Sequence, residues 1–275
     1  MTPKPLTISV VTPCLNDARR LELTMRSIHD QGYADLEHIV IDGGSTDGSL
    51  EIIQHFTPRL AYWCSEHDDG HGDALGKGLD RATGDVVTWV CSNDLLLPGS
   101  LATVGQYFAT HPQTDWLVGN GLVIDEQSRV SSRVWAVPFT VRSILFWELW
   151  GTCQPAVFIR RSAFEEVGGI DRRLNVAVDT DLFIRLARLS KPTRINSFLG
   201  ALRFHADSQS NLCSREVRET DERIRQREGR PSWPPMILRI IHRLYGWRFR
   251  GIQRLNEALR FNKPYPIGVP VYASS

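Results

Sequence analysis

The first hundred residues alternate between strand-like and helix-like stretches, and this alternation constrains the fold more than any other feature. Apolar, β-branched runs typical of buried strands occupy 8–13, 36–42, 60–65 and 86–91. Apolar residues at helical spacing occupy 19–30, 49–56, 74–82 and 100–111. Strands that are separated by helices pair in parallel through right-handed crossovers. The pattern therefore predicts an α/β fold with a mostly parallel sheet flanked by helices.

The chain changes character near residue 212. Before this point, further strands are expected at 116–125, 131–137, 155–160 and 198–204, with helices at 140–150, 162–167 and 179–187. Beyond it, 215–230 is dense in charges of both signs, and the stretch from Met236 interleaves apolar residues with arginine. We therefore expect an α/β domain at 1–212 and a helical, basic C-terminal extension at 213–275.

The composition is that of an ordinary globular protein, with a net charge of +1 and 42% hydrophobic residues. It gives no indication of a nucleic-acid partner, and none is expected. The five cysteines are scattered without a CxxC pair, which is typical of reduced thiols in a cytoplasmic protein. The N-terminal stretch lacks a signal-peptide pattern, and no apolar run reaches the roughly 18–20 residues that span a bilayer. The expected location is the cytoplasm.

The stretch from Met236 leaves two interpretations open. A basic amphipathic helix can lie on an anionic membrane, which would place the protein peripherally at the inner face and suit a lipid-linked acceptor. Alternatively, the helix packs on the domain or on a second subunit of an oligomer.

Polar residues follow the expected strands where each one ends. The fourth strand runs into Ser92-Asn93-Asp94, the second ends in Asp42, and the first ends in Thr12-Pro13. Ligands of open α/β sheets bind at the carboxyl ends of the strands. The turn after Asp42 contains neither of the common glycine patterns that bind phosphate. We therefore expect a site built from side chains at this edge of the sheet.

Several segments together, in their order and spacing, resemble the family-2 glycosyltransferases. The segments are Thr12-Pro13 with Asn16, 41–48, 65–78 (with Glu66, Asp69, Asp73 and Lys77), 92–94, 154–160 and 179–185. The resemblance covers the chain to about residue 210. It implies an inverting enzyme with the Rossmann-like GT-A fold that uses a nucleotide-sugar donor.

The resemblance assigns one group of residues to the donor, for which a UDP-sugar is the main expectation. Asp42 can accept a hydrogen bond from the uracil imide, or it can instead form an Asx-turn with its own loop. The other expected donor or acceptor contacts are Thr12 and Pro13 as a wall, Asn16, Asp73, Lys77, Ser92, Asn93 with the ribose, and Gln154 in a sugar pocket. Asp73 can equally be a helix N-cap, and Lys77 a solvated surface lysine.

A Mg²⁺ or Mn²⁺ ion is expected to neutralise the departing diphosphate. Family members usually carry a pair of acids at this strand end, whereas this chain has Asn93 followed by Asp94. Asp94 is the expected metal ligand. His205 is a second candidate ligand, beside the alternative that it is structural.

Transfer with inversion requires a base next to the acceptor hydroxyl. Asp179 and Asp181 lie in the first turn of an expected helix, where the family motif usually reads Glu-Asp and this chain reads Val178-Asp179. We expect Asp179 to be the base and Asp181 to support it. Both carboxylates can alternatively serve only to compensate the helix dipole.

The sequence thus predicts transfer of a sugar to a hydroxyl of a glycan, a glycolipid or another acceptor. The alternative is a catalytically silent relative that only binds nucleotide or glycan, because Asn93 and Val178 replace acids. A sugar-nucleotide pyrophosphorylase is disfavoured because the expected glycine-rich N-terminal signature is missing.

Overall fold

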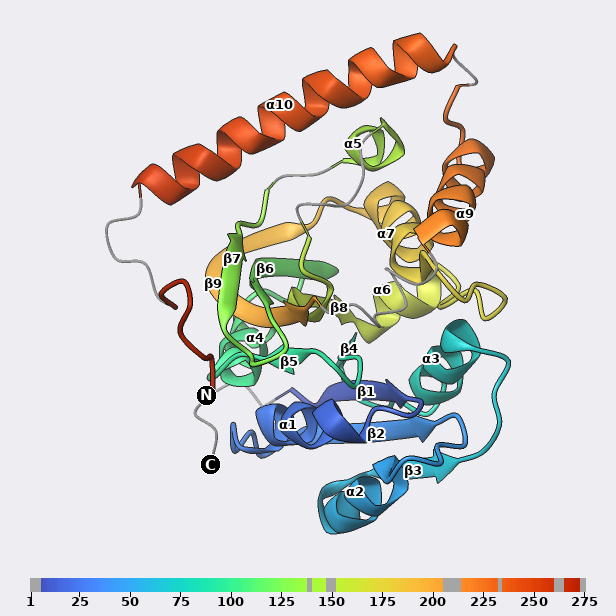
Figure 1. The fold of residues 1–275 in the computed structure, drawn as a ribbon, viewed down its shortest axis with the longest axis vertical. Coiled ribbons are helices and arrows are strands. Elements are labelled where there is room, and N and C mark those ends of the chain that lie inside the picture. The colour runs from blue at the N-terminus through green and yellow to red at the C-terminus, as the bar shows by residue number, and fades with distance from the viewer. Residues whose placement is uncertain are drawn as a thin grey trace.

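The computed structural model describes residues 6–137, 140–146, 152–204, 214–231, 234–259 and 265–272. Its centre is a nine-stranded sheet with the order β3-β2-β1-β4-β8-β6-β9-β5, and β7 pairs with β6 outside this path (Figure 1). The fold is mixed α/β, with a curled, mostly parallel sheet and helices on its faces, as the sequence predicted.

The N-terminal half of the sheet is entirely parallel. Strands β1, β2, β3 and β4 pair as β3-β2-β1-β4, and helices connect them. The elements are β1 (Ile8–Cys14), α1 (Ala18–His29), β2 (Leu36–Asp42), α2 (Ser49–Phe56), β3 (Tyr62–Ser65), α3 (His71–Leu79) and β4 (Val86–Trp89). Parallel pairing brings the carboxyl ends of these strands to one edge, where the polar loops meet.

The second half adds antiparallel pairs around a long, curved strand. β8 joins β4 to β6 antiparallel, and β9 runs parallel to β6 and antiparallel to β5 (Figure 1). The elements are β5 (Leu95–Leu96), α4 (Ser100–Thr110), β6 (Trp116–Ile124), β7 (Val130–Val134), α5 (Val141–Phe146), β8 (Val157–Arg160), α6 (Arg161–Glu166), α7 (Val178–Leu189) and β9 (Thr193–Arg203). The curvature of β9 brings its last residue back to the loop after β4.

Both faces of the sheet are buried. Along β1, Val10 packs into the cluster with Ile28 and Phe108 of α1 and α4, whereas Val11 packs into the cluster with Leu75 of α3. Successive strand residues point to opposite faces of the sheet, so one apolar run contributes side chains to the core on both faces. This explains why the strands read as near-continuous apolar stretches.

Two further helices and a short tail complete the described chain. α9 (Ser214–Arg227) packs on α7, and α10 (Pro235–Leu259) contacts α5. The segment 265–272 then returns to the sheet, where Val130 N–H donates to the Val269 carbonyl at 3.0 Å. The proposed division of the chain at residue 212 stays a prediction. Among the described helices, none is both long and apolar enough to cross a bilayer.

Two local expectations were wrong. α3 begins at His71 rather than at 74, after Gly70 with a φ of 113°, so Asp73 lies in the first turn and is not the N-cap. α6 begins at Arg161 rather than at 162, and no side-chain hydrogen bond caps it. The start of α3, three residues earlier than expected, removes Asp73 from the capping position.

Candidate active site

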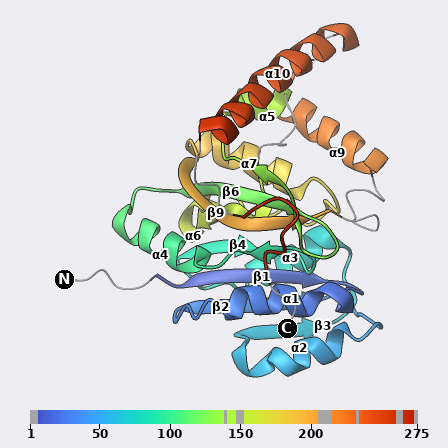
Figure 2. The ribbon, with the colours of Figure 1, turned by 60° about the vertical axis from the view of Figure 1, so that its left-hand side comes forward.

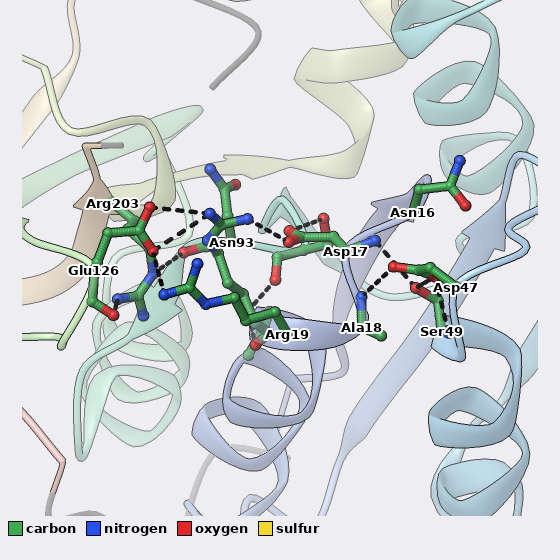
Figure 3. A network of polar contacts seen from close by, with 12 residues as sticks. Asn16, Asp17, Ala18, Arg19, Asp47, Ser49, Asn93, Glu126 and Arg203 are labelled. Carbon is green, nitrogen blue, oxygen red and sulfur yellow. Dashed lines mark hydrogen bonds and ion pairs between the residues drawn. The ribbon is translucent and has the colours of Figure 1, made fainter. Parts of the chain in front are cut away.

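The loops after β1 and β2 are tied together by side chains. Asn16 has a left-handed backbone with a φ of 50°, and its Oδ1 accepts a hydrogen bond from the Thr46 N–H at 2.8 Å. Asp47 Oδ2 accepts from the Ala18 N–H at 2.9 Å (Figure 3). Asparagine tolerates this backbone conformation better than most residues, which suits it to the tight link. The two strand ends therefore form one rigid wall.

Asp42 at the end of β2 is fully buried and organises its own loop. Its Oδ2 accepts hydrogen bonds from Ser45 N–H at 2.9 Å, Gly44 N–H at 3.2 Å and Ser65 Oγ at 2.6 Å. Its Oδ1 accepts from the Ser45 hydroxyl. This is the geometry that the Asx-turn alternative anticipates. The role of Asp42 toward uracil stays a prediction.

Thr12 and Pro13 lie in the last part of β1, beside Val40 and Ile41 of β2. The Thr12 hydroxyl is buried and lies 3.0 Å from Nε2 of His38, and Nδ1 of His38 lies 2.9 Å from Nε2 of His29. Burial lowers the pKa of His38 well below its ordinary value and that of His29 to about 4. The hydroxyl of Thr12 is thus used inside the fold.

The loop between β3 and α3 carries an ion-paired group. Lys77 Nζ lies 3.0 Å from Asp73 Oδ2 and 3.1 Å from Glu66 Oε1. Burial opposes ionisation of Asp73, but the Lys77 bond and the Asp69 N–H outweigh it and lower its pKa. Lys77 is therefore anchored by acids rather than freely solvated. Glu66 follows Ser65, which bonds Asp42, whereas Asp73 and Lys77 lie on α3.

The Ser92-Asn93-Asp94 turn is the most strongly held part of the site. Asp94 is only 5% exposed, and its Oδ1 accepts a hydrogen bond from the Arg203 N–H at 2.8 Å. Burial raises the pKa of Asp94 to about 7, which Arg203 only partly offsets. Thr24 Oγ1 donates to the carbonyls of Ser92 and Asp94 at 2.7 and 2.8 Å. A rigid carboxylate results, for which the protein supplies little compensating charge.

Two residues at this turn escaped the sequence analysis. Arg203 is 6% exposed, and its guanidinium donates to the carbonyl of Asn93 at 2.9 Å, the carbonyl of Asp125 at 2.7 Å and Ser128 Oγ at 2.9 Å. Asp17 accepts the Ser92 hydroxyl at 2.8 Å, and the Asp17 N–H donates to Ser49 Oγ at 3.1 Å. Asp17 thus joins the turn after β4 to the start of α2 (Figure 3). It occupies the N-cap position of α1 without making a side-chain cap bond.

Asp179 lies at the start of α7. Its Oδ1 accepts from the Thr180 N–H at 2.9 Å, and burial, assisted by the nearby charge of Asp221, raises its pKa. Both Asp94 and Asp179 help to raise the pKa of the Cys91 thiol, behind the larger effect of burial.

Asp181 follows Asp179 by two residues in the first turn of α7, and its carboxylate forms ion pairs. Arg185 Nε donates to its Oδ2 at 3.0 Å, and the Arg227 guanidinium of α9 bonds its Oδ1. Asp181 is 1% exposed. Its carboxylate therefore connects α7 to α9.

Gln154 is buried against the end of β4, where its Nε2 donates to the Trp89 carbonyl at 2.8 Å. His205 lies outside the described residues. Within the described part of the chain, no three His, Cys, Asp or Glu side chains are grouped so that they could hold a metal ion. A site for a cation here would therefore depend on Asp94 together with ligands from outside those residues.

Polar loops anchored at the carboxyl ends of parallel strands, with carboxylates of raised pKa beside them, are typical of a ligand site in an open α/β sheet. Residues 9–168 match the sequence model of the family described as Glycosyl transferase family 2. An uncharacterized glycosyltransferase of Mycobacterium tuberculosis is 32% identical over 201 residues, which cover 72% of this chain and 75% of that protein. A PGL/p-HBAD biosynthesis glycosyltransferase of Mycobacterium bovis is 31% identical over 195 residues, covering 70% and 73%.

Solved structures share the fold. The Staphylococcus aureus TarS 1–349 complex with UDP-GlcNAc has a TM-score of 0.67 at 16% identity, over 93% of this chain and 76% of that one. The mannosyltransferase PcManGT from Pyrobaculum calidifontis, in complex with GDP-Man and Mn²⁺, has a TM-score of 0.57 at 19% identity, over 95% and 82%. The chain belongs to glycosyltransferase family 2, has the GT-A fold, and is a glycosyltransferase.

Proposed function

We propose that this glycosyltransferase moves a sugar from a UDP-sugar to a hydroxyl of a glycan, glycolipid or other acceptor, with inversion and assisted by Mg²⁺ or Mn²⁺. One observation carries the proposal. The buried Asp94 in the turn after β4 and the part-buried Asp179 in the first turn of α7 come from different elements, and each carboxylate accepts a backbone N–H. Two separately placed carboxylates suit an arrangement with the leaving diphosphate at one side of the sugar and the attacking hydroxyl at the other.

The nucleotide is proposed to bind along the strand-end loops. Asp42 Oδ1 accepts only the Ser45 hydroxyl among the described residues, and a carboxylate oxygen can accept two hydrogen bonds. One acceptor position of Oδ1 is therefore unused by the described residues, and we propose that it accepts the uracil imide N–H. The TarS structure of the same fold is a complex with UDP-GlcNAc, which agrees with a UDP-sugar.

The remaining donor contacts are proposed on the same edge of the sheet. Pro13 and the backbone of Thr12 form the wall, and Asn93 contacts the ribose. The other proposed contacts are Asn16, Asp73, Lys77, Ser92 and Gln154. Several of these side chains are already fixed by protein partners, so they would meet the donor without much loss of side-chain entropy.

A divalent cation fits the donor set at Asp94. Oδ1 of Asp94 accepts a hydrogen bond from the Arg203 N–H, whereas its Oδ2 accepts no hydrogen bond from the described residues. A cation beside this carboxylate would favour its charged form, which burial disfavours. Asp94 would hold the ion, with His205 as the second proposed ligand and phosphate and water oxygens as the rest. When bound, the ion neutralises charge on the departing diphosphate.

Asp179 is proposed as the base. It takes the proton of the acceptor hydroxyl while that oxygen bonds the anomeric carbon. The bond from this carbon to the diphosphate oxygen breaks, and the nucleoside diphosphate leaves with the electron pair. Attack opposite the leaving group inverts the configuration, and a raised pKa makes Asp179 a stronger base. Asp181 would support Asp179 by holding α7 against α9.

The test is a screen of nucleotide sugars with the full chain, read by released nucleoside diphosphate. Turnover is expected with a UDP-sugar in Mg²⁺ or Mn²⁺ and not in EDTA, and proton NMR of the product should show the opposite anomer. Asp94→Asn should remove the metal response. The exposed carboxylate of Asp30, outside the site, provides the matched control Asp30→Asn.

A silent binding protein is the competing function, favoured by Asn93 and Val178 at positions where the family usually has acids. Calorimetric binding of UDP without turnover of any donor would establish that alternative and overturn the enzyme mechanism. The proposed compartment is the cytoplasm, in keeping with the four described cysteines, which are all free.

A further inference from the structure

Helix α10 lies along the outside of the molecule and is fixed at both ends. Before it, α9 packs on α7, and after it the segment 265–272 bonds to β7. Between these anchors α10 contacts α5 and runs well away from the strand-end loops (Figures 1 and 2). The helix is therefore held in a defined position while one of its faces points outward.

The outward face is apolar. Along it lie Met236, Ile240, Leu244, Trp247 and Leu255, whose exposed fractions range from 51% to 75%. Their spacing of three, four or eight residues places them on one side of an α-helix. We call these five residues the apolar stripe. Large, contiguous apolar surfaces of this kind mark contacts with a partner or a membrane.

Arginines accompany the apolar stripe. Arg243, Arg250 and Arg254 are exposed, and steps of seven and four residues align them along one edge of the stripe. Over its whole length α10 contains five arginines, one glutamate and no aspartate. An apolar face bordered by uncompensated positive charge complements an anionic lipid surface, where the side chains enter the acyl boundary and the guanidinium groups meet the headgroups.

We propose that the apolar stripe of α10 binds the surface of an anionic phospholipid bilayer, with α10 parallel to the membrane plane. Trp247 is the most exposed member, and tryptophan is a residue type that anchors proteins at the interface between membrane and water. A second copy of the chain fits this face less well. A symmetric helix pair would bring two arginine rows together, with one glutamate on each helix to offset them.

Flotation of the full chain with lipid vesicles tests this inference. The protein should float with vesicles that contain phosphatidylglycerol and much less with phosphatidylcholine alone, and high salt should weaken flotation. Trp247→Ser and the pair Arg243→Glu with Arg250→Glu should each lower the partition coefficient about tenfold. Ile267→Ser and Arg59→Glu are matched controls, because both residues are exposed and lie outside α10.

Two results would overturn the inference: a wild-type protein that stays unbound at every lipid composition, or α10 variants that float like the wild type. Light scattering tests the other possible partner of the apolar stripe, a second copy of the chain. If the wild type is a dimer and Trp247→Ser dissociates it, the stripe is a dimer contact and not a membrane contact. Turnover of soluble donor by the same variants separates this test from the proposed function, since none of the altered residues belongs to the active site.

Discussion

The backbone N–H of Arg203, the last residue of β9, donates to Oδ1 of Asp94 at 2.8 Å. The guanidinium of Arg203 donates hydrogen bonds to the carbonyl of Asn93 and to the carbonyl of Asp125 in the loop after β6. One residue thus fixes both the orientation of the Asp94 carboxylate and the backbone around it. The candidate metal ligand is held from a strand that follows it by more than a hundred residues.

Arg203→Met is expected to weaken both the fold and the site. The change keeps the backbone bond to Asp94 but leaves the carbonyls of Asn93 and Asp125 without their buried donor. The free energy of unfolding should fall by about 2–4 kcal/mol, and the Mn²⁺ concentration for half-maximal activity should rise. Denaturant unfolding and metal titration measure the two effects. The exposed Arg129→Met is the control, and equal behaviour of the two variants would contradict the prediction.

Asp179→Asn is expected to lower kcat by roughly 10²–10⁴-fold, because the amide cannot accept the proton of the acceptor. The fold should tolerate the change, since burial already disfavours the ionised carboxylate. Steady-state kinetics and thermal unfolding together check this. A variant that retains turnover within tenfold of the wild type would exclude Asp179 as the base.

Asp181→Asn should lower the stability of the fold more than it lowers activity. Its carboxylate is buried and pairs with Arg185 and with Arg227, which is itself half exposed. The loss should cost about 2 kcal/mol of stability, below the range for a fully buried pair. Activity should fall less than in Asp179→Asn. If instead turnover disappears while the melting temperature is unchanged, Asp181 takes part in the chemistry directly.

The pair of His29 and His38 should make stability sensitive to acid. Burial is the main cause that lowers the pKa of both imidazoles, for His29 to about 4. The unfolded chain therefore binds protons first, and stability should fall as the pH drops from about 6.5 toward 4. His29→Gln removes one such group, so unfolding experiments across this range should give a shallower slope than the wild type. An unchanged slope would exclude His29 as a source of the acid sensitivity.

The sequence was informative where local pattern decides the structure. The alternation of apolar runs predicted the parallel strands, and the polar residues that end β1, β2 and β4 do lie at one edge of the sheet. Arg203 was missed because its contacts with Asp94 depend on the curvature of β9 and span 109 residues. Asp17 was missed because nothing in the local sequence indicates that Ser92 lies within its reach.

Asp181 is a second residue whose contacts the sequence predicted only in part. Its pair with Arg185 follows helical spacing, four residues apart, and is visible in the sequence. Its second partner, Arg227, comes from α9, and the docking of α9 on α7 cannot be inferred from periodicity. Local spacing therefore predicted which carboxylates belong to the helix start, but not which of them is already neutralised.

The segment 265–272 has a consequence for solubility. Val130 bonds Val269 and Gly268, and Arg129 forms an antiparallel bridge with Pro270, so the tail covers the side of β7 that faces away from β6. Strand edges without a partner are templates for pairing with other chains. A chain that ended before Tyr265 would leave this ladder open, and we expect it to form aggregates through β7 even though every strand of the sheet is intact.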